Sequence, residues 1–124
     1  MKTDNLIVGK SKAFALRIIK LFKYLRGEKN EYILSKQLLR SGTSIGANVR
    51  EATRAQSKAD FNAKIAIALK EAEETAYWLE LLFEGEYLEK EAFASIYSDC
   101  NEVCKILMSI SKTGKEGEFA THND

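Results

Sequence analysis

Apolar residues recur at intervals of three and four positions along most of this 124-residue chain, and polar residues fill the positions between them. That spacing places the apolar residues on one side of a helix and predicts amphipathic helices. Short polar connections separate the helices, so each helix should run antiparallel to the next. The pattern therefore predicts an all-α fold, an up-down-up-down four-helix bundle, with helices at residues 8–26, 31–55, 58–84 and 90–112.

The second predicted helix carries two glycines, Gly42 and Gly46, within its apolar pattern. Each glycine costs a helix interior about 1 kcal/mol relative to alanine, so a chain that keeps both is expected to need them. The apolar register nevertheless continues from Leu38 to Val49, which favours one bent helix over two helices joined by a loop. We predict a bend near Gly42 and Gly46, and close packing of another helix against them.

The third predicted helix carries Trp78, the single tryptophan of the chain, next to Tyr77 and beside the apolar seam at Leu79. A tryptophan at the edge of a seam is typical of a subunit interface, and ordinary core packing is the alternative. We predict that Tyr77 and Trp78 belong to an oligomer interface. The bundle should occupy residues 1–112, and the polar segment 113–124 should be a disordered tail.

Composition agrees with this fold. The length fits one domain, and the absence of proline suits long uninterrupted helices. No apolar run reaches the ~18 residues of a membrane span, and the start of the chain does not have the pattern of a signal peptide, so we expect a cytoplasmic protein. Cys100 and Cys104, four residues apart in the last helix, are expected to be ordinary apolar helix residues.

The sequence lacks the residue sets of the common catalytic and metal sites. Its one histidine, His122, lies in the polar tail, so we expect neither a Ser-His-Asp set nor the Glu-x-x-His pairs of a di-iron bundle. The segment from Gly42 to Gly46 is one residue short of a phosphate-binding loop and has no lysine after it. We therefore expect no enzyme, no cofactor, no metal ion and no small-molecule substrate.

Charge divides the chain into two halves, although the net charge is only +1. Residues 1–70 hold fifteen lysines and arginines against five aspartates and glutamates, a balance of +10, and residues 71–124 hold four against thirteen, a balance of −9. Either the acidic half neutralises the basic half, within or between subunits, or part of the basic half stays exposed and attracts a polyanion. Spacings of three and four along the helices select the candidate nucleic-acid-binding residues Arg17, Lys20, Lys23, Arg50 and Arg54.

A family resemblance is carried mainly by the second helix. It rests on residues 37–52, with the sequence QLLRSGTSIGANVREA, and extends to Asp60-Phe61 and to residues 74–79, ETAYWL. These motifs resemble those of the four-helix bundle proteins encoded in intervening sequences of bacterial 23S ribosomal RNA genes, the S23-type family. The resemblance implies a ring-like homopentamer. It also implies a relation to the basic, pentameric accessory proteins of diversity-generating retroelements, which bind nucleic acid and a reverse transcriptase.

Two functional hypotheses follow from these observations. The leading hypothesis is a non-enzymatic, self-assembling bundle that acts as a nucleic-acid-associated scaffold, with RNA bound on the basic face of the first two helices. The alternative is a protein-interaction module whose basic half serves oligomer assembly instead of nucleic-acid binding. Both hypotheses make the chain its own partner in a homo-oligomer, and neither involves a membrane.

Overall fold

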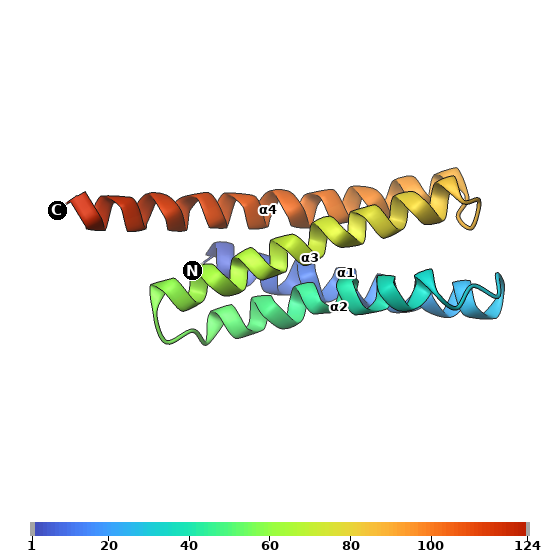
Figure 1. The fold of residues 1–124 in the computed structure, drawn as a ribbon, viewed down its shortest axis with the longest axis horizontal. Coiled ribbons are helices and arrows are strands. Elements are labelled where there is room, and N and C mark those ends of the chain that lie inside the picture. Colours follow the sequence, from blue (N-terminus) through green and yellow to red (C-terminus); the bar gives the residue numbers. More distant parts are fainter. Residues whose placement is uncertain (1, 124) are drawn as a thin grey trace.

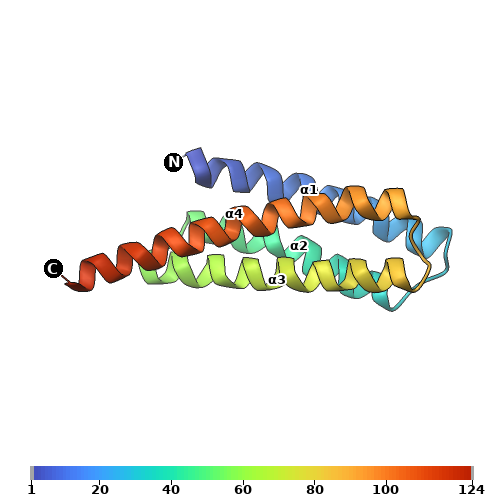
Figure 2. The ribbon, with the colours of Figure 1, turned by 90° about the horizontal axis from the view of Figure 1, so that it is seen from above.

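The computed structural model describes the backbone of residues 2–123 and the side chains of residues 5–114, and this part of the chain folds into four α-helices (Figure 1). The helices are α1 (Lys2–Gly27), α2 (Leu34–Thr53), α3 (Lys58–Glu84) and α4 (Lys90–Asn123). Consecutive helices run in opposite directions and pack side by side (Figures 1 and 2). The predicted all-α, up-down-up-down four-helix bundle is confirmed.

The helix bounds agree with the sequence pattern for α3 and differ for the other helices. α1 begins at Lys2, before the predicted start at residue 8, and α4 continues past residue 112 to Asn123. Figure 1 shows that the C-terminal end of α4 extends beyond the other three helices. The disorder predicted for residues 113–124 stays a prediction, because the described side chains end at residue 114.

Each helix turns its apolar side toward one common core. α1 contacts α2 and α4, and α3 contacts the same two helices, so the four helices form a square in cross-section. Burying one large apolar side chain contributes about 1.5–3 kcal/mol, and this gain fixes which side of each helix faces inward. All four helices supply fully buried side chains, including Phe14, Ile18, Ile45, Leu79 and Leu107.

α2 is one continuous helix through both of its glycines, and α1 packs closely against it there. A Cβ atom added to Gly42 would lie 2.8 Å from the Cγ1 and Cγ2 atoms of Ile18, well inside the usual separation of two carbon atoms. At Gly46 the nearest atom would be the Ser11 Oγ at 3.4 Å. α1 therefore approaches α2 more closely at Gly42 than at Gly46. The predicted bend near the two glycines stays a prediction.

A buried polar contact joins α2 to α3 one residue before Gly42. The Thr75 Oγ1 lies 2.8 Å from the Ser41 Oγ and 2.8 Å from the Glu71 carbonyl oxygen. Both hydroxyl side chains are fully buried, where a polar group without a partner would cost about 1–3 kcal/mol. The pair therefore favours one register between α2 and α3.

α2 begins three residues after the start that its sequence pattern predicts, because Glu31 is used to cap it. The Glu31 carboxylate accepts hydrogen bonds from the backbone N–H groups of Ile33, Leu34 and Ser35, at 3.3, 3.0 and 2.7 Å. The Ser35 hydroxyl donates in return to the Glu31 carbonyl oxygen at 2.8 Å. A negative charge at this place also suits the positive end of the helix dipole, so Glu31 fixes where α1 turns into α2.

We expect Gly42→Ala to destabilise the protein and Gly46→Ala to leave its stability unchanged or raise it. The methyl group at Gly42 must displace Ile18, which is β-branched and fully buried, at a typical cost of about 1–3 kcal/mol. At Gly46 the methyl group has room, and alanine restores up to about 1 kcal/mol of helix propensity. Urea unfolding at one protein concentration measures both variants, and equal midpoints would contradict a tight contact at Gly42.

We also expect Glu31→Ala to lower the free energy of unfolding by about 1–2 kcal/mol, because the first turn of α2 loses the acceptor for its N–H groups. Glu28→Ala is the matched control. It removes the same charge from an exposed position in the same turn, where a substitution typically changes stability by less than about 0.5 kcal/mol. Equal stability losses in the two variants would show that Glu31 is not a cap.

Candidate nucleic-acid interface

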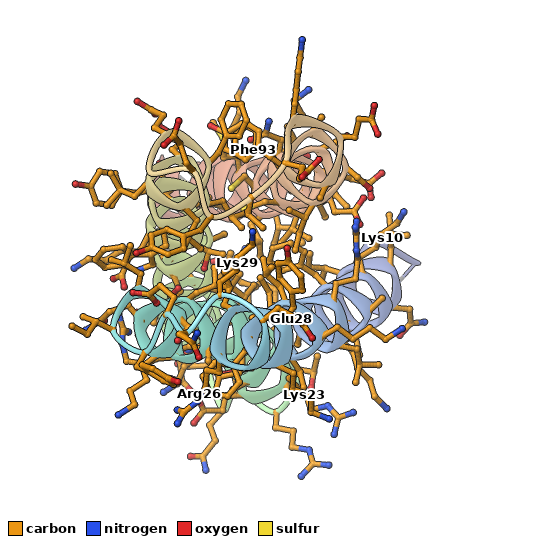
Figure 3. All side chains as sticks on the ribbon, turned by 90° about the vertical axis from the view of Figure 1, so that its right-hand side faces the viewer. Lys10, Lys23, Arg26, Glu28, Lys29 and Phe93 are labelled. Carbon is orange, nitrogen blue, oxygen red and sulfur yellow. The ribbon has the colours of Figure 1, made fainter. Side chains whose placement is uncertain are left out.

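Most of each charged half of the sequence lies in one layer of the bundle, although Lys58, Lys64 and Lys70 of the basic half lie on α3. Between residues 5 and 54, which cover nearly all of α1 and α2, eleven lysines and arginines stand against the acidic residues Glu28, Glu31 and Glu51. The acidic residues from Glu71 to Glu118 lie on α3, on α4 and in the turn between them. Figure 3 looks along the bundle and shows Lys23 pointing away from α3 and α4, whereas Lys10 extends toward α4. The bundle therefore has a basic layer and an acidic layer.

Ion pairs join the two layers along their shared edges. On the α4 side, Lys10 pairs with Glu102 at 2.9 Å and Arg17 pairs with Asp99 at 2.7 Å. Arg17 also donates a hydrogen bond to the Ser95 Oγ at 3.2 Å. On the α3 side, Arg40 pairs with Glu71 at 3.2 Å and with Glu74. Part of the basic half is thus neutralised by the acidic half of the same chain.

The cations on the outward sides of α1 and α2 have no such partner. Six of them are exposed, and none has a carboxylate partner among the side chains that the structure describes. Lys20 shares the lining of one pocket with Glu89, but no ion pair joins these two described side chains. We call this surface the basic face, and it consists of Lys12, Lys20, Lys23, Lys36, Arg50 and Arg54.

The basic face spans both helices without a break at their junction. Lys12 of α1 and Arg50 of α2 line one shallow groove of about 320 Å³ between the two helices. Small residues keep this groove open, including Gly46 and Ala47 of α2 and Ala15 of α1. The two rows of cations therefore lie on one surface, which suits contact with successive phosphates of a polyanion.

The structure places four of the five predicted nucleic-acid-binding residues on the basic face. Arg17 is the exception, because its guanidinium group is bound to Asp99 and Ser95 of α4. Lys12 and Lys36 belong to the face and were not among the predicted residues. Their outward position in the helical period is the signal that would have found them.

Aromatic side chains lie close to several cations near the turn between α1 and α2. The Arg26 guanidinium lies 5.3 Å from the ring centroids of both Phe22 and Tyr32. The Lys29 ammonium lies 6.0 Å from the ring centroid of Tyr24. These distances are within the range of cation–π attraction. One end of the basic layer therefore combines positive charge with partly exposed rings.

The two predicted oligomer-interface residues lie on α3, away from the basic face. The Tyr77 side chain is 53% exposed, and its ring centroid lies 5.3 Å from that of Trp78. Trp78 is half-buried against the core and donates its indole N–H to Glu74, 2.9 Å away. Tyr77 thus has an exposed ring, and the place of both residues in an oligomer interface stays a prediction.

Shifted pKa values occur between α3 and α4, on the opposite side of the core. The hydrogen bond from the Tyr97 hydroxyl to Glu80, 2.7 Å long, raises the pKa of Tyr97 to about 12. The contact between Cys100 and Cys104, together with burial, raises the pKa of the Cys100 thiol. Cys100 is fully buried and Cys104 is half-buried. These groups belong to the packing of α3 against α4.

The described residues form neither a metal-ligand cluster nor a membrane-spanning helix. No three histidine, cysteine, aspartate or glutamate side chains within the described range gather as a metal site would require. In the same part of the chain, no helix combines the length and the apolar character that crossing a membrane requires.

Comparison with known proteins finds a family model and similar solved structures. The model of a family described as 23S rRNA-intervening sequence protein matches residues 3–109. The crystal structure of a protein of unknown function from the S23 ribosomal protein family of Bacteroides thetaiotaomicron is also similar. It has 56% identity and a TM-score of 0.87, and the match covers 89% of this chain and 98% of that one. No protein of curated function matches, and the relation to retroelement accessory proteins stays a prediction.

Proposed function

Because the chain belongs to the family of 23S rRNA-intervening sequence proteins, we propose that it is a non-enzymatic, self-assembling bundle that binds nucleic acid, with RNA as the candidate partner. The phosphate backbone would lie on the basic face. Several copies of that face in one homo-oligomer would raise the avidity for a long strand without new contacts in each subunit. The proposed setting is the cytoplasm, where the chain would meet RNA.

The observation that carries this proposal is the contrast between paired and unpaired cations. Lys10, Arg17 and Arg40 lie at the edges of the basic layer and are held by carboxylates of α3 and α4. Intramolecular neutralisation therefore stops at the edges and leaves the basic face uncompensated. Clustered lysines and arginines on one surface are the electrostatic pattern of a nucleic-acid-binding protein.

The alternative function, a protein-interaction module, is supported by a different observation. The exposed acidic layer of one copy is complementary in charge to the basic face of another copy. Apolar side chains near it add to this surface, because Ile67 and Tyr77 of α3 are 42% and 53% exposed. In this case the basic face would be covered in the oligomer and closed to RNA.

Binding to single-stranded RNA should weaken linearly in log affinity against log salt, with a slope of about −0.7 for each phosphate bound. The quadruple variant Lys20→Gln, Lys23→Gln, Arg50→Gln, Arg54→Gln should have a shallower slope, by about 0.7 for each phosphate that it no longer binds. Fluorescence anisotropy with a labelled oligonucleotide at several salt concentrations measures the slope. Thermal melting checks that the fold is retained, because exposed charges contribute little to stability.

The matched control carries the same change of net charge on the other layer. Lys70→Gln, Lys90→Gln, Lys105→Gln and Lys112→Gln together replace four exposed lysines of α3 and α4. We expect this control to keep the wild-type slope. If both variants change the slope equally, net charge and not the basic face governs binding. If the wild-type protein does not bind RNA at low salt, the protein-interaction module replaces the proposal.

Light scattering should give a mass several times that of the 14.0 kDa chain, and a homopentamer is the expected species. Tyr77→Glu should shift the mass toward that of the monomer, because a buried interface would then have to desolvate an unpaired carboxylate. Tyr32→Glu is the control at a similarly exposed tyrosine, 48% exposed against 53%. A wild-type protein that is monomeric at micromolar concentration would refute the assembly.

A further inference from the structure

A pocket opens beside the basic face, between α1 and the start of α4. Its volume is about 470 Å³, which lies within the range of small-molecule and cofactor sites. Its floor is apolar and is held by core packing, because Leu88 and Ile96 are only 7% and 4% exposed and Leu21 is half-buried against the same core. The pocket therefore offers a preformed apolar surface next to positive charge.

One wall of the pocket is an aromatic ring. Tyr24 lines the pocket and is 39% exposed. The Lys29 ammonium lies 6.0 Å from the centroid of this ring, a contact that helps to hold the ring in place. A flat ring beside an apolar floor is the arrangement on which unpaired bases stack in proteins that bind single strands.

The mouth of the pocket carries one free cation and one acidic residue. Lys20 is exposed and has no carboxylate partner among the described side chains, whereas Arg17 is fixed to Asp99 and serves as a wall. Lys23 follows Lys20 one helical turn away, on the basic face. Glu89 lies on the α4 side of the mouth, so a phosphate should approach along α1.

We propose that this pocket accepts an unpaired base of a single-stranded nucleic acid, with the adjoining phosphates at Lys20 and Lys23. This inference rests on the proposed function and names its substrate class, single strands in preference to duplexes. In a duplex the bases are stacked and paired, so none can enter a pocket without the cost of opening the helix. The basic face by itself would hold phosphates of either form.

The test compares a labelled oligouridylate with an RNA duplex of the same length by fluorescence anisotropy at low salt. The wild-type protein should bind the single strand more tightly. Tyr24→Leu keeps an apolar side chain but removes the ring. It should weaken single-strand binding by about fivefold or more, the lower bound for the loss of one stacked base, and leave duplex binding unchanged.

The matched control is Tyr32→Leu. Tyr32 is also an exposed tyrosine, at 48%, with a cation 5.3 Å from its ring centroid, but it does not line the pocket. This variant should bind both RNAs as the wild-type protein does. Ala92→Phe is a second probe, because Ala92 is exposed and lines the pocket. A phenylalanine there fills the pocket without changing any charge, and it should also remove the preference for single strands.

The outcomes distinguish a failure of the pocket inference alone from a failure of the proposed function. If the wild-type protein binds both RNAs in a salt-dependent way but Tyr24→Leu and Ala92→Phe match it on single strands, the pocket inference is overturned and the basic face remains. If Tyr32→Leu loses as much single-strand affinity as Tyr24→Leu, the pocket inference is likewise overturned. If the wild-type protein binds neither RNA at low salt, the proposed function fails and the pocket inference fails with it.

Discussion

The contact between Ile18 and Gly42 places α1 against α2, and the basic face depends on it. A side chain at Gly42 would occupy the space that the Ile18 carbons fill, at 2.8 Å from where its Cβ would lie, so the helices could not approach as closely. Immediately before this point, Ser41 meets Thr75 in a fully buried contact. One short segment of α2 therefore positions both α1 and α3, and it brings the two basic helices side by side with their cations facing outward.

The charge layers follow from this arrangement. Interactions between solvent-exposed charges are largely screened beyond about 8 Å at physiological ionic strength, and packed helices lie about 8–10 Å apart. A polyanion at the basic face is therefore attracted by the cations of that face more strongly than it is repelled by the carboxylates across the core. The edge cations differ, because Lys10 and Arg17 reach carboxylates on α4 directly. A net charge of +1 thus describes a strongly polarised molecule and does not argue against binding to nucleic acid.

Local features of the sequence predicted much of the fold. The bounds of α3 follow from its apolar period and from Ser57, whose side chain accepts a hydrogen bond from the Asp60 N–H at the helix start. The apolar pattern predicts a start for α2 that is too early, because Glu31 fits the pattern of a helix residue, whereas its carboxylate caps the helix. Glu31 can cap α2 only because of the way the chain turns after α1, where Asn30 has a φ of 53°. The apolar period carries no information about this turn.

By itself the sequence determined that there are four helices, which side of each is buried, and that positive charge predominates on the first two helices and negative charge on the last two. These features depend on residues a few positions apart, which the helical period relates directly. Only the tertiary structure decided that Arg17 is held by Asp99 while Lys20 and Lys23 have no carboxylate partner among the described side chains. It also decided that α1 approaches Gly42 more closely than Gly46, and that Tyr24 shares a pocket with Leu88. Each of these facts depends on the distance between helices that are far apart in the chain, and that distance is set by side-chain packing across the core.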